Sequence, residues 1–166
     1  MRPFRFTSSA RFLLLAAILI SVALPAAAQS TDAAVAKVVS LMKANNYNFQ
    51  TTRSPTVWVV RLTGTHLKDV KVVLAIGTDA DPSLVIFVTV VEKRRMPVNT
   101  DFMRTLLEQN HVMDRVKIAF DKDGDLEVRS DSKLRLADAT EFQEIVTQVK
   151  NASDELYGLI EPQLLP

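Results

Sequence analysis

Acidic side chains gather in the turns of this chain, and their spacing comes nearest to a metal-binding or catalytic pattern. Residues 121–125 (DKDGD) resemble the start of a calcium-binding loop. An EF-hand loop that began at Asp121 would need glycine at its sixth position and glutamate at its twelfth, where this chain has Leu126 and Ser132. Because Asp-Gly between two apolar, alternating runs is a strong signal for a hairpin, we expect a β-turn here.

A carboxylate site is the alternative that would make the protein an enzyme. Asp79, Asp81 and Asp123 could serve a small hydrolase or transferase if their turns met around an apolar cleft. His66 and His111 are isolated and lack the spacing of a helical zinc site. The chain has no cysteine, so thiol nucleophiles and thiolate metal sites are excluded. The residues therefore predict no catalytic, metal-binding or cofactor-binding position, and we expect a protein that is not an enzyme.

The N-terminal 28 residues have the pattern of a secretory signal peptide. Three arginines lead into an apolar run, residues 12–24, and a short Ala-x-Ala motif ends at Ala28. We expect cleavage between Ala28 and Gln29, and a mature protein in the periplasm or outside the cell. The apolar run is shorter than the ~20 residues that span a bilayer, so we expect no stable membrane anchor after cleavage.

The expected mature chain, residues 29–166, is nearly balanced in charge. Loss of the leader removes three arginines and no acidic residue, which leaves 17 basic against 19 acidic side chains and a formal net charge of −2. Such a balance disfavours the electrostatic capture of nucleic acid. The length suits a single domain, and without cysteine its stability has to come from an apolar core rather than from disulfides.

Hydrophobic periodicity predicts an α+β domain. Apolar residues at helical spacing, and β-branched runs between turn residues, mark the elements. They are a helix over residues 31–46, strands over 56–63, 69–76 and 84–91, a helix over 100–109, strands over 115–120 and 126–130, and a last helix from 138 to 160. The order α-βββ-α-ββ-α predicts a roughly five-stranded antiparallel sheet packed by helices.

The packing of three elements can also be predicted. The strand over residues 84–91 (LVIFVTVV) is apolar on both sides, so we expect it at the centre of the sheet with cover on both faces. The last helix starts with capping-box spacing at Asp138 and Glu141 and continues as a long apolar stripe. The helix over 100–109 is expected to turn four apolar side chains inward: Phe102, Met103, Leu106 and Leu107.

A run of elements in the second half of the chain has a recognisable order. Residues 106–110 (LLEQN) end a helix, residues 116–126 (VKIAFDKDGDL) form a strand, a turn and the start of a second strand, and residues 152–156 (ASDEL) lie near the end of the last helix. This order resembles the YbjN family of bacterial sensory transduction regulators, whose domain has the fold of type III secretion chaperones. The resemblance implies a non-enzymatic scaffold, often dimeric, that binds or regulates another protein.

Our leading hypothesis is an exported accessory module that binds or regulates a protein partner. We also expect a homodimer, from the family fold and from the open edges of such a sheet. The candidate contacts with a partner are Val35, Val38, Val39, Met42, Trp58, Arg94 and Arg95. In the alternative interpretation the five apolar residues fill the core, and the basic residues 93–95 are a solvated strand end. A further alternative is a carrier that holds a small apolar ligand in a cleft between the sheet and the helices.

Overall fold

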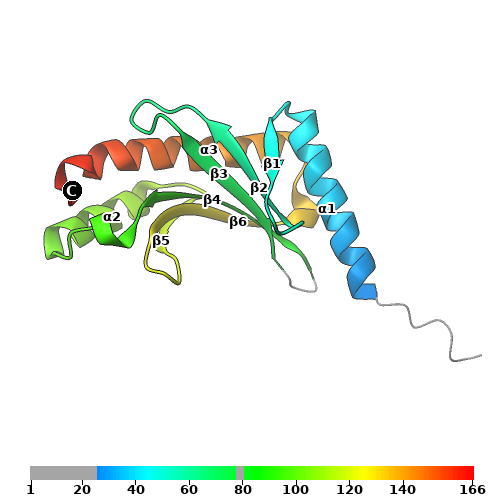
Figure 1. Cartoon of the computed structure of the whole chain (residues 1–166), viewed down its shortest axis with the longest axis horizontal. Coiled ribbons are helices and arrows are strands. Elements are labelled where there is room, and N and C mark those ends of the chain that lie inside the picture. Colours follow the sequence, from blue (N-terminus) through cyan, green and yellow to red (C-terminus); the bar gives the residue numbers. More distant parts are fainter. Residues whose placement is uncertain (1–25, 78–80) are drawn as a thin grey trace, which may run out of the picture.

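The computed structural model describes residues 26–77 and 81–166, with side chains from residue 31 onward. In these ranges the chain forms three α-helices and one antiparallel sheet, which is the expected α+β class (Figure 1). The apolar run of the expected signal peptide lies outside the described residues. The elements are α1 (Ala26–Ala44), β1 (Phe49–Thr51), β2 (Val57–Leu62), β3 (Val70–Ile76), β4 (Ser83–Val91), α2 (Thr100–Val112), β5 (Lys117–Phe120), β6 (Leu126–Lys133) and α3 (Ala139–Ile160).

The sheet has six strands in the order β1-β2-β3-β4-β6-β5, and each neighbouring pair is antiparallel. The sequence predicts all of them except β1. That strand has only three residues, too few to show an alternating pattern. It pairs with the part of β2 that lies nearest the turn between the two strands. β4 lies between β3 and β6, so the expected central place of this strand is confirmed.

α1 begins at Ala26, earlier than the sequence predicts. The expected cleavage bond between Ala28 and Gln29 therefore lies within the backbone of this helix. The helix ends at Ala44, and Asn46 follows with a φ of 56°, a left-handed conformation that often terminates a helix. Among the described residues, no helix is both long enough and apolar enough to cross a membrane.

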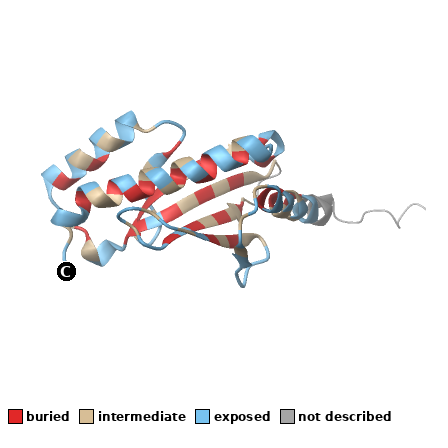
Figure 2. Ribbon diagram, turned by 90° about the horizontal axis from the view of Figure 1, so that it is seen from above, coloured by how far each residue is buried: buried red, intermediate tan, exposed pale blue. Residues whose placement is uncertain are grey.

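α3 packs along one face of the sheet, over β3, β4 and β6 (Figure 1). Asp138 caps its start, because the carboxylate accepts a hydrogen bond from the backbone N–H of Glu141 at 2.9 Å, as the capping-box spacing predicts. Every second strand residue points toward this helix, which gives the alternating burial in Figure 2. The most deeply buried of them, at most 2% exposed, are Trp58, Val60, Val70, Val72, Leu74, Leu84, Ile86, Val88, Val91, Leu126 and Val128.

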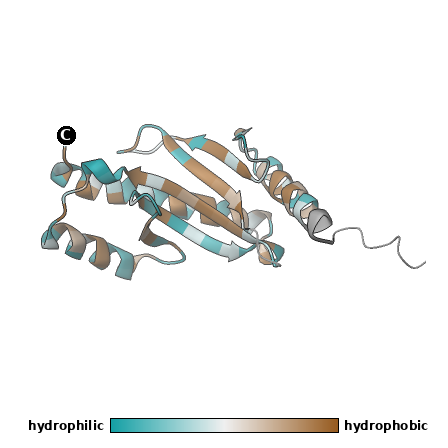
Figure 3. Ribbon diagram, turned by 60° about the horizontal axis from the view of Figure 1, so that its bottom comes forward, coloured by the Kyte–Doolittle hydropathy of each residue, from teal (hydrophilic) through white to brown (hydrophobic). Residues whose placement is uncertain are grey.

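The opposite face of the sheet carries no helix in the part of the chain that the structure describes (Figure 3). Val85 and Phe87 of β4 point to this face and are only half-buried, whereas Leu84 and Ile86 beside them are 0% exposed. The expectation that β4 has cover on both faces is therefore wrong. Its continuous apolar run reflects an apolar surface on the second face rather than a second layer of helix.

α2 rests against the edge strand β5. Asn99 caps it by accepting a hydrogen bond from the backbone N–H of Phe102 at 2.8 Å. Phe102 and Leu106 lie one helical turn apart and are buried, but Met103 is 39% exposed and Leu107 is 67% exposed. The expectation that all four apolar side chains point inward is wrong for Met103 and Leu107, because a helix at a sheet edge buries only a narrow stripe.

Candidate functional site

The uncovered face of the sheet carries six apolar side chains in two rows, which we call the open-face strip. Directly opposed residues of antiparallel strands stand side by side on one face, so each row crosses β2, β3 and β4. One row is Val57, Ala75 and Val85, and the other is Val59, Val73 and Phe87. All six are half-buried. The rows are adjacent, so the six apolar side chains lie together on β2, β3 and β4. Figure 3 shows that these strands are hydrophobic along most of their length.

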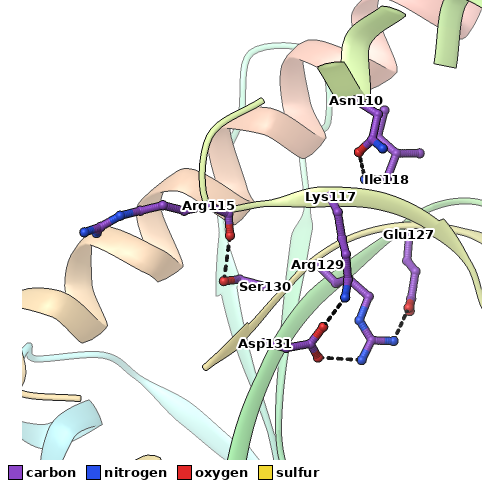
Figure 4. Close-up of polar contacts among 8 residues, drawn as sticks. All are labelled: Asn110, Arg115, Lys117, Ile118, Glu127, Arg129, Ser130 and Asp131. Atoms are coloured by element: carbon purple, nitrogen blue, oxygen red, sulfur yellow. Dashed lines mark hydrogen bonds and ion pairs between the residues drawn. The ribbon is translucent and has the colours of Figure 1, made fainter. Parts of the chain in front are cut away.

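An ion ladder of Lys117, Asp131, Arg129 and Glu127 borders the open-face strip on β5 and β6 (Figure 4). The Asp131 carboxylate lies 2.5 Å from Lys117 Nζ and 2.7 Å from Arg129 Nη2, and Arg129 Nη1 donates to Glu127 at 2.8 Å. Partial burial acts to raise the pKa of Asp131, but the hydrogen bonds and charges of Arg129 and Lys117 outweigh it and lower that pKa. Each cation of the ladder faces an anion, so this border is neutral as a group.

The segment between α2 and β5 is held to its surroundings by side chains (Figure 4). Asn110 accepts a hydrogen bond from the backbone N–H of Ile118 at 2.8 Å, and Ser130 Oγ donates to the carbonyl of Arg115 at 2.9 Å. Arg115 has a φ of 59°, an unfavourable region for this residue type, and its guanidinium lies 3.2 Å from two carboxylates of α3. These contacts fix the edge strand and, with it, the ion ladder.

At the end of β4 the open-face strip meets a hollow of about 410 Å³, which we call the basic hollow. It is lined by Lys71, Val73, Thr89, Val90, Val91, Glu92, Arg94 and Arg95. Glu92 is the single acidic residue in this lining, and it pairs with Arg94 at 2.6 Å. Lys71 Nζ lies 4.0 Å from Asp69, whose carboxylate also pairs with Arg61. Cations therefore outnumber carboxylates at this end of the open face.

Asp154 of α3 is a buried carboxylate that the sequence reasoning missed. It is 5% exposed and accepts hydrogen bonds from the backbone N–H groups of Thr65, His66 and Leu67 at 2.7, 2.8 and 2.7 Å. Burial alone would raise its pKa, but the three backbone donors hold the pKa below its ordinary value. Gly64 leaves the necessary room, because a Cβ there would lie 2.2 Å from Asp154 Oδ1. This Asp154 clamp fixes the turn between β2 and β3 onto α3.

Two of the three carboxylates that could make an enzyme, Asp81 and Asp123, lie far apart. Asp81 pairs with Lys133 at 3.6 Å and with Arg135 at 3.2 Å, at the end of the β4–β6 pair where Ser83 faces Lys133. Asp123 lies in the turn at the opposite end of β6, so the length of that strand, roughly 25 Å, separates the two. Asp79 lies outside the described residues.

The expected hairpin turn between β5 and β6 is confirmed. The Asp121 carboxylate accepts hydrogen bonds from the backbone N–H groups of Asp123 and Asp125 at 2.9 Å, and Gly124 has a φ of 87°. Asp121 is thus engaged in shaping the turn. Within residues 26–77 and 81–166, no group of three or more His, Cys, Asp or Glu side chains could hold a metal ion.

The apolar candidates for partner contact lie mainly inside the domain. Val38, Met42 and Trp58 are at most 1% exposed and belong to the core, which was the alternative that the sequence left open. A partner that meets the folded surface does not reach them. Val35 and Val39 are partly buried and pack against the same core. Core side chains pack between the sheet and α3. A hollow of about 320 Å³ lies between α2 and α3, beside Val116.

The two basic candidates, Arg94 and Arg95, lie next to the open-face strip. Arg94 is exposed and Arg95 half-buried, and both line the basic hollow next to the open-face strip. Sequence reasoning did not single out the strip itself. Its signal was the two-sided apolar pattern of residues 84–91, which indicates either a second covering layer or an exposed apolar face.

The fold is that of type III secretion chaperones. No protein-family model matches the sequence, and no curated protein does. Among solved structures, the chain is similar to one in the ExsC–ExsE complex, with 13% identity, 78% of this chain and 94% of that chain covered, and a TM-score of 0.55. It is also similar to one in the heterodimeric ExoU–SpcU complex of the Pseudomonas aeruginosa type III secretion system, with 14% identity, 75% and 95% covered, and a TM-score of 0.50.

Proposed function

We propose that this protein is a binding module without catalytic activity, and that it holds a segment of a partner polypeptide on the open-face strip. The strip itself carries the proposal, because a continuous apolar surface on a folded domain usually marks an interaction site. Val73 and Phe87 stand opposite each other in its second row, and charged side chains border the apolar rows. An apolar centre with a polar rim is the usual anatomy of a protein interface.

The likeness to secretion chaperones supports a protein partner. The chains of that fold named above were solved as the ExsC–ExsE complex and as the heterodimer ExoU–SpcU. By analogy, the ligand of this chain is also a protein. We further propose that the chain belongs to the YbjN family, on the order of elements in residues 106–126, since that family shares the chaperone fold.

We also propose that the protein is exported. The arginines, apolar run and Ala-x-Ala motif of the first 28 residues support cleavage between Ala28 and Gln29, and a mature domain of residues 29–166 in the periplasm or outside the cell. Intact-mass measurement of the protein purified from the periplasmic fraction tests this. We expect an N-terminus at Gln29, and a full-length chain confined to the cytoplasm would contradict it.

The exposed side of α2 supports a homodimer. Leu107 is 67% and Val112 71% exposed, and β5 beside this helix is the outermost strand of the sheet. Light scattering at micromolar concentration should give twice the monomer mass, and Leu107→Gln should shift the protein toward the monomer. A monomer in the unsubstituted protein would overturn the dimer without affecting the open-face strip.

The partner-binding proposal is tested by photo-crosslinking in cells. A photoreactive residue replaces Phe87 in the open-face strip, and a matched control replaces Gln143, an exposed residue on the outer side of α3. We expect one recurrent polypeptide adduct from Phe87 and none from Gln143. Equal adducts from both positions, or none from Phe87 in a folded protein, would contradict the proposal.

A further inference from the structure

We propose that the partner segment carries acidic side chains next to its apolar stretch, and that these side chains bind the basic hollow through Lys71, Arg94 and Arg95. This inference rests on the proposed function. It adds the charge of the partner segment and the direction in which the segment lies across the sheet.

The open-face strip and the basic hollow are continuous. Val73 belongs to the strip and also lines the hollow. Lys71 lies two residues before Val73 on the same face of β3, a step of roughly 6.6 Å along a strand. A polypeptide whose apolar side chains rest on Val73 therefore reaches the cations of the hollow within a few residues.

The cations of the hollow are weakly satisfied by the protein itself. The Arg94–Glu92 pair is largely in solvent, with side chains 80% and 56% exposed. Such an exposed pair contributes little to stability, so Arg94 can exchange Glu92 for another carboxylate at small cost. Arg95 Nε donates to the carbonyl of Leu165 at 3.4 Å, and no ion pair of Arg95 is found within the described part of the chain.

Lys71 is the third cation in the lining of the basic hollow, and it too is weakly paired. Its ammonium is 4.0 Å from the Asp69 carboxylate, and Asp69 is shared with Arg61. Side chains of Lys71 and Asp69 are 59% and 50% exposed, so this contact is also solvated. An incoming carboxylate would find three cations in the lining against the single carboxylate of Glu92.

The basic hollow and the ion ladder differ in net charge, and this difference orients the partner segment on the open face. Lys117 and Arg129 are each within 2.8 Å of an acidic partner, and Arg129 is only 30% exposed. The ladder side of the open face therefore offers no excess charge, while the end at the basic hollow is positive. Charge complementarity of this kind sets the orientation of a bound partner more than its affinity. The acidic end of the segment accordingly lies at the basic hollow.

The test keeps the photoreactive residue at Phe87 and changes the charge of the hollow. One background is unsubstituted, a second carries Arg94→Glu with Arg95→Glu, and a control carries Lys43→Glu with Lys122→Glu. Both control residues are exposed and lie outside the hollow, and the net charge change is the same. Thermal unfolding followed by circular dichroism confirms that each variant is folded.

We expect the adduct yield to fall about fivefold or more in the Arg94→Glu/Arg95→Glu background and to stay unchanged in the control. Mass spectrometry of the adduct should place Asp or Glu within a few residues of the crosslinked apolar stretch. Equal yields in all backgrounds, a segment without acidic residues, or an adduct with a second copy of this chain would overturn the inference. Absence of any adduct in the unsubstituted background would instead overturn the proposed function.

Discussion

The two faces of the sheet are built from the same strands and from nearly the same kinds of side chain, but they differ in what covers them. On β3, Leu74 points toward α3 and is 0% exposed, while Val73 beside it points away and is half-buried. On β4, Ile86 and Phe87 repeat the difference. One face forms the core of the domain. The other keeps an apolar surface without a covering helix, and it is there that we propose a partner binds.

This difference shows that apolar content alone does not define a core. A face becomes core when an amphipathic element of matching length packs on it, and α3 provides that for one face with the stripe of Phe142, Ile145, Val149 and Leu156. α1 and α2 lie at the two ends of the domain and do not extend across the other face (Figure 1). The open-face strip is therefore an apolar layer on which no helix packs among the described residues.

The largest expected effect compares neighbouring residues on the two faces. Leu74→Ala leaves a cavity under α3 and should lower the free energy of unfolding by about 2–5 kcal/mol. Val73→Ala, on the open face, should cost about 1 kcal/mol or less, because little buried surface is lost. Urea denaturation of both variants measures the difference. Similar losses would show that the open face is as well packed as the covered one.

The Asp154 clamp should give the next largest effect. In Asp154→Asn one carboxylate oxygen becomes an NH2 donor, so at least one of the three backbone N–H groups loses its acceptor and the remaining hydrogen bonds lose their charge. The free energy of unfolding should fall by about 1.5–3 kcal/mol. The native pKa of Asp154 lies below the unfolded value of ~3.9, so its contribution is present above pH ~4 and is lost as the pH falls through the native pKa.

The pH dependence of stability shows how much of the effect of Asp154 comes from its charge rather than from the shape of its side chain. The stability gap between the unsubstituted protein and Asp154→Asn should stay constant from about pH 5 to 7 and narrow below pH ~4. Denaturation curves over this range measure it. A gap that does not change with pH would mean that the ionised carboxylate is not what holds the turn.

A smaller effect on stability, with a large one on binding, is expected within the open-face strip. Val59→Thr together with Val73→Thr keeps both β-branched shapes and should change the free energy of unfolding by about 1 kcal/mol or less. The adduct formed from Phe87 should fall about fivefold, because the partner loses apolar contact. If the yield is unchanged while the fold is intact, the partner does not lie on the strip.

The smallest effect is expected at the rim. Lys117→Gln removes an exposed member of the ion ladder and should change stability by no more than about 0.5 kcal/mol. Because Lys117 helps to lower the pKa of Asp131, that pKa should rise in the variant. A titration of the Asp131 carboxyl by nuclear magnetic resonance measures the shift, and a loss of stability comparable to that of Leu74→Ala would contradict the division into a covered and an open face.

Local patterns in the sequence predicted local structure well. Capping by Asp138 and the two-sided apolar character of residues 84–91 are both visible in the chain and both are present in the structure. What covers each face is a tertiary property, so the sequence did not show that the second side of β4 stays open. Asp154 was missed for the same reason, since its donors in residues 65–67 lie far away in the sequence. Its signal was an acidic residue beside the buried stripe of a helix.

The Asp154 clamp joins positions that are 87 to 89 residues apart, and α3 follows all six strands in the sequence. Until α3 is made, both sides of the sheet lack cover, and contacts of such long range close slowly. Hairpins can form earlier, but they have nothing to pack against. The sheet therefore gains its cover only once α3 is present, and a chain truncated before α3 should aggregate rather than fold.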